Sequence, residues 1–348
     1  MTRAAEQVAI RSRGDRVSFT VRPRGLVVAG SLLLLIAACF LVSLALGKYT
    51  VAVPDVIAAL AGTGSEQVRL VVVDWRLPRA LLSALFGAAL GLSGAIFQSL
   101  TRNALGSPDV IGFNMGSYSG VLVVMLAGGS GFLLIASGAV IGGLVTAFLV
   151  YLFAYKRGVQ GFRLIIIGIA LSAMLGSLNT WIMVKADVAF AMQAAVWGAG
   201  TLNGVTWVEV WPSIALFVVF AVALAVLAPG IRQLELGDEN AKLQGLKVER
   251  SKVRMIVLGV GFTALVTAAA GPISFIALAA PQLARRLTRA GASIDLVASA
   301  LVGAALLSIA DLIAQHALPG VSLPVGAVTV SIGGLYLVWL LARETKTR

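Results

Sequence analysis

The sequence predicts an all-α integral membrane protein with about ten transmembrane helices. Three observations point to this fold class. Hydrophobic residues make up 59% of the 348 residues and charged residues only 12%, which is about half the charged fraction of a soluble domain. The mean hydropathy is +0.97. Apolar runs, most of them close to the roughly 20 residues that cross a bilayer, recur along the whole chain.

The apolar runs divide the chain into one short arm and one ten-span domain, residues 26–348. The third and eighth runs are shorter than the others, and Gly271-Pro272 reads as a helix stop followed at once by a helix start. The even number of runs places both termini on the same side of the membrane. The runs lie at residues 26–46, 79–98, 110–127, 132–154, 163–184, 211–229, 254–270, 273–287, 294–314 and 325–342.

The first 25 residues form a basic arm, which we expect to lie on the cytoplasmic membrane surface. Its only acids are Glu6 and Asp15. A secretory signal is the alternative, but the basic region is long and the first apolar run has the length of a full span. The arginines of the arm are Arg3, Arg11, Arg13, Arg16, Arg22 and Arg24.

The basic residues also predict the orientation of the chain. Loops that face the cytoplasm hold most of the Lys and Arg of a membrane protein. With the N-terminus inside, the predicted cytoplasmic segments hold all 27 basic residues except Lys48, Arg69, Arg76, Arg79 and Lys185. We therefore expect both termini to be cytoplasmic.

Residues 187–211 are apolar but are interrupted by glycines, and they contain Trp197, Trp207 and Trp211. Tryptophan is enriched where a membrane meets water. We expect an interfacial or re-entrant segment on the outer face. An eleventh span is the alternative, and it would place the C-terminal basic residues outside.

Small residues recur at every fourth position in several runs, as at Gly87 and Gly91 in the second and at Ser172 and Gly176 in the fifth. Such rows allow helix backbones to approach closely in lipid. They predict a tightly packed bundle rather than a binding site.

Catalytic, metal and ion-coupling motifs are missing from the sequence. Apart from residues in the first or last three positions of a run, Asp311 is the one charged residue within the apolar runs, whereas ion and proton carriers place such residues along their path. The segment at Lys48 lacks the glycine and the Ser or Thr of a phosphate-binding loop. Cys39 and His316 are single residues of their kind. We expect a protein that is not an enzyme and has no cofactor.

Residues 231–255 form a charged island between two long apolar blocks. Apolar residues alternate with the charges at helical spacing, and Gly237 and Gly245 interrupt the run. This pattern predicts two short amphipathic helices that meet a soluble partner. A solvated connecting loop is the alternative.

Three segments carry a resemblance to a known family: residues 75–117, which include SGAIFQSL and GSPDVIGFN, residues 271–287 with GPISFIAL, and residues 323–341. They resemble the FecCD family, the membrane permeases of ATP-binding-cassette (ABC) importers for iron siderophores, haem and cobalamin. The likeness runs from the first span to the last. It implies a type II importer permease, with ten spans in each subunit of a dimer.

The resemblance implies three sets of functional residues. Residues 231–252 would form the coupling helices that dock into the ATPase, and two arginines would meet carboxylates of a binding protein. Two cytoplasmic turns would gate the path. The coupling residues are Leu236, Gly237, Ala241, Gly245, Val248 and Arg250, the docking residues are Arg76 and Arg79, and the gate residues are Asn103, Leu105, Gln160 and Gly161.

Each of these sets has an alternative or a departure from the family pattern. The two arginines could instead reach the membrane interface as isolated cations, and Asn103 could simply cap a helix. Gln244 stands where the family usually has leucine, and Gln315 where relatives often have a further arginine. A third docking salt bridge is therefore not expected.

The resemblance also implies partners and substrate. We expect an ABC ATPase dimer, a second permease subunit that forms a heterodimer, an extracytoplasmic siderophore-binding protein and the lipid bilayer, and no nucleic acid. The expected location is the bacterial cytoplasmic (inner) membrane. The expected substrate is a ferric siderophore of the catecholate, enterobactin-like type. Haem, cobalamin and, from another class, an ion-coupled secondary carrier are the alternatives.

Overall fold

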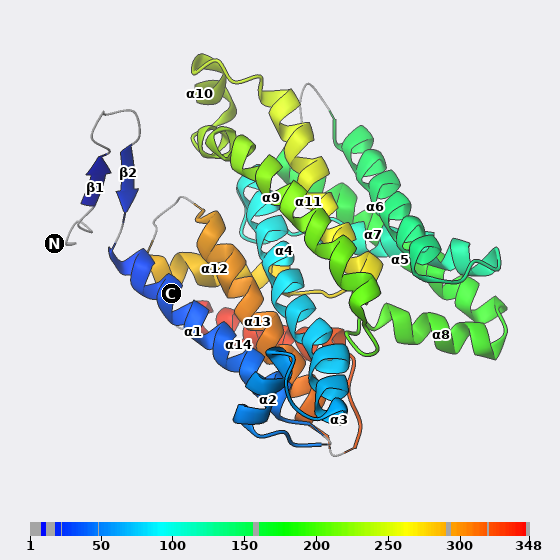
Figure 1. The fold of residues 1–348 in the computed structure, drawn as a ribbon. Coiled ribbons are helices and arrows are strands. Elements are labelled where there is room, and N and C mark those ends of the chain that lie inside the picture. Colours follow the sequence, from blue (N-terminus) through cyan, green and yellow to red (C-terminus); the bar gives the residue numbers. More distant parts are fainter. Residues whose placement is uncertain are drawn as a thin grey trace.

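The structure, a computed structural model, describes residues 8–11, 18–21, 23–47, 49–155, 160–289, 294–318 and 320–345. Two short antiparallel strands, β1 (Val8–Arg11) and β2 (Ser18–Val21), lie in the predicted arm. The rest of the described chain is mainly helical (Figure 1). The helices are α1 (Pro23–Ala45), α2 (Val53–Leu60), α3 (Glu66–Arg69), the π-helical segment Leu70–Arg76, α4 (Leu77–Thr101), α5 (Phe113–Leu126), α6 (Phe132–Ala154), α7 (Gly161–Lys185), α8 (Val188–Gly198), α9 (Trp207–Glu235), α10 (Asp238–Leu243), α11 (Val248–Ala270), α12 (Ile276–Thr288), α13 (Leu296–His316) and α14 (Val325–Thr345).

A helix occupies each of the ten predicted runs. Within the described residues, seven helical segments are long and apolar enough to cross a membrane: α1, α3 to α4, α6, α7, α9, α11 and α13. The other three runs hold α5, α12 and α14. The structure thus has the helices of a multi-pass membrane protein.

Helix α12 is shorter than a full membrane span. It has 13 residues, so it extends about 20 Å at 1.5 Å per residue, less than the hydrocarbon core of a bilayer. Gly271 ends α11 at a φ of +73°, as the Gly-Pro pair predicts, and the chain resumes a helix only after Phe275, at a φ of +77°. The Asp109 carboxylate accepts the backbone N–H of Phe275 at 2.9 Å and so holds the start of α12.

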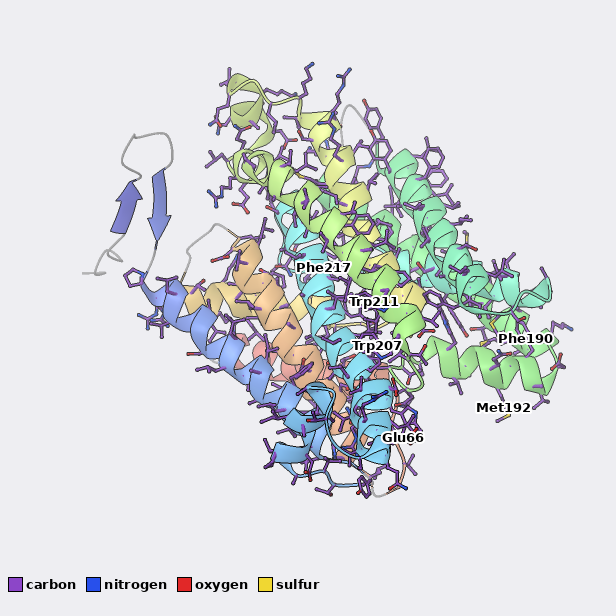
Figure 2. The ribbon with its side chains drawn as sticks, in the orientation of Figure 1. Glu66, Phe190, Met192, Trp207, Trp211 and Phe217 are labelled. Carbon is purple, nitrogen blue, oxygen red and sulfur yellow. The ribbon has the colours of Figure 1, made fainter. Side chains whose placement is uncertain are left out.

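The segment from 187 to 211 is not one continuous helix. Helix α8 has 11 residues, too few to cross the bilayer, and α9 begins separately at Trp207. Trp207 and Trp211 stack at the start of α9 with ring centroids 5.7 Å apart (Figure 2). Trp207 also donates from its indole to the carbonyl oxygen of Val73 at 3.1 Å. This arrangement fits the predicted interfacial or re-entrant segment rather than an eleventh span.

Helix α4 lies at the centre of the fold and packs against α9, α11, α12 and α13 (Figure 1). In the most apolar 18-residue stretch of the segment Glu66–Thr101, which contains α4, 78% of the residues are buried within the chain. The predicted small residues permit the α4–α13 contact, because a Cβ added at Gly87 would lie 2.3 Å from the carbonyl oxygen of Gly303. One added at Gly91 would lie 2.2 Å from that of Ser299.

Replacing Gly91 with alanine is expected to destabilise the chain by about 1–3 kcal/mol, because the added methyl group would push two helix backbones apart. Gly176→Ala is the matched control. It lies in another small-residue row, but its added Cβ meets no atom within 4 Å. Thermal unfolding in detergent should show a lower Tm for Gly91→Ala alone. Equal Tm values for the two variants would refute this packing.

The two ends of the bundle carry different elements. Figure 1 shows α10, with the adjoining ends of α9 and α11, at one end, and α2, α3 and α8 toward the other. Helices α2 and α3 follow α1 and precede α4, in a segment to which the sequence assigned no element. The predicted coupling and docking residues therefore lie at opposite ends of the molecule.

Candidate coupling, docking and gate sites

The charged island folds as one separate helix, α10, between the ends of α9 and α11. The expectation of two separate short helices is wrong, because residues up to Glu235 continue α9 and residues from Val248 already belong to α11. The two predicted breaks are correct. Gly237 and Gly245 have φ values of +111° and +83°, in a region that residues with a Cβ rarely occupy.

An ion-pair cluster fixes the start of α10 to the bundle. The Asp238 carboxylate binds Arg102, which ends α4, and Lys252 of α11. Burial opposes ionisation of Asp238, but Lys252 and Arg102 outweigh this effect and hold the pKa of the carboxyl below its ordinary value. The Lys252 side chain is only 4% exposed. A force on α10 would therefore pass directly to α4 and α11.

Glu235, at the end of α9, makes a second connection. Its carboxylate accepts from the Ser99 hydroxyl of α4 at 2.7 Å and from the Ile294 backbone N–H, just before α13, at 3.2 Å. One side chain thus joins the ends of three membrane helices beside α10. Local sequence patterns do not predict this contact, because the three residues lie far apart in the chain.

The predicted coupling residues separate into two groups. Leu236, Gly245 and Arg250 are exposed, and Gly237 is half-buried. Ala241 and Val248, by contrast, are buried within the chain, at 0% and 3% exposure. These two residues position α10 against the bundle and present no surface to a partner.

Leu243 is an exposed residue of α10 that is not among the predicted coupling residues. Its side chain is 87% exposed, and that of Leu236 is 61% exposed. Both leucines lie in the charged segment that follows the apolar part of α9. Contiguous exposed apolar patches, rather than single exposed leucines, mark contacts with another protein, and Leu236 and Leu243 are the exposed leucines of this segment. Alternation of apolar and charged residues had placed Leu243 on a helix, but its exposure depends on the tertiary fold.

Arg76 is engaged within the chain at the opposite end. It precedes α4, and its guanidinium donates to the carbonyl oxygens of Leu44 at 2.7 Å, Ala45 at 3.2 Å and Tyr49. These acceptors lie at and just after the end of α1, where helix carbonyls have no partner within the helix. Arg76 therefore joins α1 to α4.

Arg79 forms a buried ion pair with Asp311. Nε and Nη2 of Arg79 lie 2.8–3.1 Å from the Asp311 carboxylate oxygens, and the two side chains are 15% and 2% exposed. Gln315 donates to the same carboxylate at 2.7 Å, and Arg79 Nη1 donates to Asn203 at 2.6 Å. The pair explains why Asp311 is tolerated in an apolar run.

The start of α7, which contains one predicted gate residue, lies against the end of α4, which precedes the other gate turn. A Cβ added at Gly161, where α7 begins, would lie 2.6 Å from the Cα of Thr101, where α4 ends. Asn103 accepts the Leu105 backbone N–H at 2.9 Å, so its side chain does cap the turn. Leu105 and Gln160 are exposed. Val159, the neighbouring residue of the second turn, is outside the described residues.

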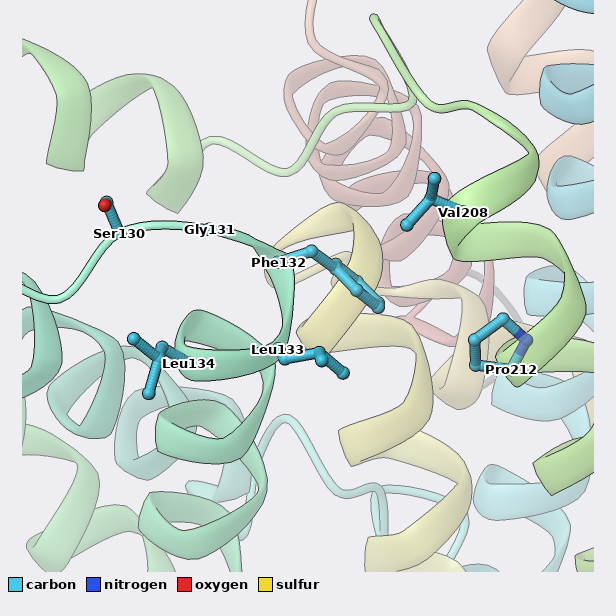
Figure 3. Close-up of a pocket in the computed structure, with 7 residues that line it drawn as sticks. All are labelled: Ser130, Gly131, Phe132, Leu133, Leu134, Val208 and Pro212. Atoms are coloured by element: carbon cyan, nitrogen blue, oxygen red, sulfur yellow. The ribbon is translucent and has the colours of Figure 1, made fainter.

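A cavity of about 480 Å³ between the starts of α6 and α9 does not provide a siderophore site (Figure 3). Figure 3 shows Phe132, Leu133, Val208 and Pro212 around it, and Ser130 is its one polar side chain. Binding a charged, highly polar iron chelate requires several hydrogen-bonding or charged groups. An acyl chain suits this lining better.

Known proteins resemble this chain over most of its length. The ferric enterobactin transport system permease protein FepG of Escherichia coli (strain K12) is 49% identical over 319 residues, 91% of this chain and 96% of that protein. The iron(3+)-hydroxamate import system permease protein FhuG of Bacillus subtilis (strain 168) is 34% identical, over 91% of this chain and 97% of that protein. The vitamin B12 import system permease protein BtuC of Serratia proteamaculans (strain 568) is 32% identical, over 81% of this chain and 85% of that protein.

A solved structure has the same fold. A transporter described as of the metal-chelate ABC type, in an inward-facing conformation, matches with a TM-score of 0.81 at 26% identity, over 91% of this chain and 99% of that one. The model of the FecCD transport family matches residues 33–343. The chain therefore belongs to the FecCD transport family, as a transporter subunit and not an enzyme.

Proposed function

We propose that the chain is a permease subunit of an ABC importer in the bacterial inner membrane, and that it carries a ferric siderophore of the enterobactin type into the cytoplasm. The observation that carries this proposal is the 49% identity, over 91% of the chain, to a ferric enterobactin permease. A separate ATPase subunit would supply the energy. The exposed side chains of Leu243 in α10 and of Leu236, just after α9, support a protein contact at that end.

The substrate is tested by uptake. Cells that lack their own enterobactin permeases should regain uptake of radioactive iron as ferric enterobactin when they express the whole importer of this chain. They should not gain uptake of labelled haem or of cobalamin. Uptake of haem or cobalamin, without ferric enterobactin, would transfer the assignment to the alternative substrates of the same family.

The remaining partners belong to the same proposal. The likeness to a permease of a two-permease system favours a heterodimer with a second permease. A solute-binding protein would dock at the outer end, where Arg76 and Arg79 lie. Since both guanidinium groups already bind groups of this chain, docking there requires that a partner carboxylate share or displace those bonds. The turns at Asn103 and Leu105 and at Gln160 and Gly161 would close the inner end.

An ion-coupled carrier is the less supported function. It would need an acid in the membrane that binds and releases a cation. Asp311 instead has its carboxylate bound by Arg79 and Gln315. This arrangement is typical of a structural ion pair.

We also propose ten spans with both termini cytoplasmic. Cysteine labelling tests this orientation after Cys39→Ser removes the native thiol. A cysteine at Leu243 in α10 should react with a membrane-impermeant maleimide only in opened cells. One at Thr63, in the loop between α2 and α3, should react in intact cells. The reverse pattern, or labelling of both from one side, would contradict the proposed topology.

A further inference from the structure

A second cavity, of about 300 Å³, lies where the end of α6 meets the start of α11. Its lining consists of Tyr151 from α6 and of Glu249, Arg250, Val253 and Arg254 from α11. The two helices pack side by side. The cavity is open, and it lies where the apolar part of each helix gives way to charged residues.

The cavity presents two arginines at one side. Arg250 and Arg254 are one helical turn apart and both are exposed. In the part of the chain that the structure describes, neither guanidinium has a hydrogen bond or an ion pair. Glu249 is the one acid in the lining, so the cavity keeps a net positive charge. An anion with several acceptor oxygens fits these donors.

Tyr151 forms the other side of the cavity, and Tyr155 packs beside it. The rings of Tyr151 and Tyr155 lie 5.8 Å apart and are tilted by 42°. Tyrosine is enriched where acyl chains meet headgroups, because its ring is apolar and its hydroxyl is polar. A phosphate in the cavity would have a phenol as well as the arginines beside it.

Apolar side chains continue from the cavity into the membrane. On α6, Phe148 is 62% exposed, and on α11 Val257 is 54% exposed. Phe148 and Val257 stand at helical spacing from the cavity residues Tyr151 and Arg254, one turn deeper on the same faces. A ligand with a phosphate head and acyl tails would meet both parts of this surface.

We propose that this cavity binds the headgroup of an anionic phospholipid of the inner leaflet, such as cardiolipin or phosphatidylglycerol. Arg250 and Arg254 bind the phosphate, Tyr151 borders it, and the acyl chains lie over Phe148 and Val257. Basic pockets between membrane helices recognise such headgroups in general. The proposal goes beyond transport and does not depend on the substrate. Since Arg250 also belongs to the expected coupling residues, bound lipid would lie beside the ATPase contact.

Native mass spectrometry of the full chain, released from nanodiscs of equal cardiolipin and phosphatidylcholine, tests the site. The wild type should retain cardiolipin preferentially. Arg254→Gln should retain it about fivefold less, because one arginine near the headgroup is lost. Arg232→Gln is the matched control. It removes an exposed arginine at the end of α9, outside the cavity, and should retain cardiolipin like the wild type.

The outcomes decide the proposal. Equal cardiolipin retention by Arg254→Gln and the wild type would overturn the proposal. Equal losses of cardiolipin in Arg254→Gln and Arg232→Gln would also overturn it, because they would show a general attraction to positive charge without a specific site. Tyr151→Phe, which keeps the ring, should show a smaller loss than Arg254→Gln. Thermal unfolding in phosphatidylcholine alone should give the same Tm for all variants, so that a loss of lipid does not reflect a loss of fold. These results do not depend on uptake or on the substrate, and only the assignment to the inner leaflet rests on the proposed orientation.

Discussion

Leu243→Glu is expected to abolish stable binding of the ATPase subunit while leaving the permease folded. Leu243 is 87% exposed in α10, so glutamate costs little in the isolated chain. At a docked interface the same change would bury a carboxylate in an apolar pocket. Loss of a central interface residue costs about 2–4 kcal/mol, a weakening of binding of about 30-fold or more. Copurification with the ATPase subunit and the Kd of the permease for that subunit measure this weakening.

Gln244→Glu is the control for this change, because it adds the same charge at the next exposed position without removing an apolar side chain. It should weaken binding far less than Leu243→Glu. Equal effects would indicate that charge alone controls the contact. Unchanged binding in both variants would remove α10 from the interface.

Asp311→Ala is expected to destabilise the chain by about 3–5 kcal/mol, because it leaves the Arg79 guanidinium half-buried without its partner. The double variant Arg79→Met with Asp311→Leu should recover most of this loss, since apolar residues often replace a buried pair at little cost. Thermal unfolding in detergent measures both. A single variant as stable as the wild type would contradict the structural role of the pair.

The double variant also tests the docking hypothesis. If Arg79 meets a carboxylate of the binding protein, the double variant should be stable but should bind that protein more weakly than wild type. If Arg79 acts only within the chain, affinity for the binding protein should be unchanged. Arg79 and Asp311 lie 232 positions apart in the sequence, so local pattern could not have paired them.

The membrane helices were predictable because hydropathy and length determine them directly. Each predicted apolar run contains a helix, and the Gly271-Pro272 pair correctly marked the end of α11. Helices α2 and α3 were missed, since they have eight and four residues and no long apolar run. Their position depends on packing against neighbours.

The candidate sites were predictable as segments but not as surfaces. Family likeness placed coupling residues around α10, but it did not distinguish exposed Leu236 from buried Ala241 and Val248. That difference depends on how α10 packs against α9 and α11. Likewise, the internal partners of Arg76 are carbonyl groups near the end of α1, and backbone acceptors leave no mark in a sequence.

The most direct test of the account is ATP hydrolysis by the complete importer in nanodiscs, with and without the binding protein loaded with ferric enterobactin. We predict that the loaded binding protein stimulates hydrolysis by the wild-type complex. Gly245→Asp, in the turn between α10 and α11, should abolish assembly or this stimulation. If the chain forms no complex with an ATPase, and instead moves ferric enterobactin down an ion gradient, the assignment as an ABC permease is wrong.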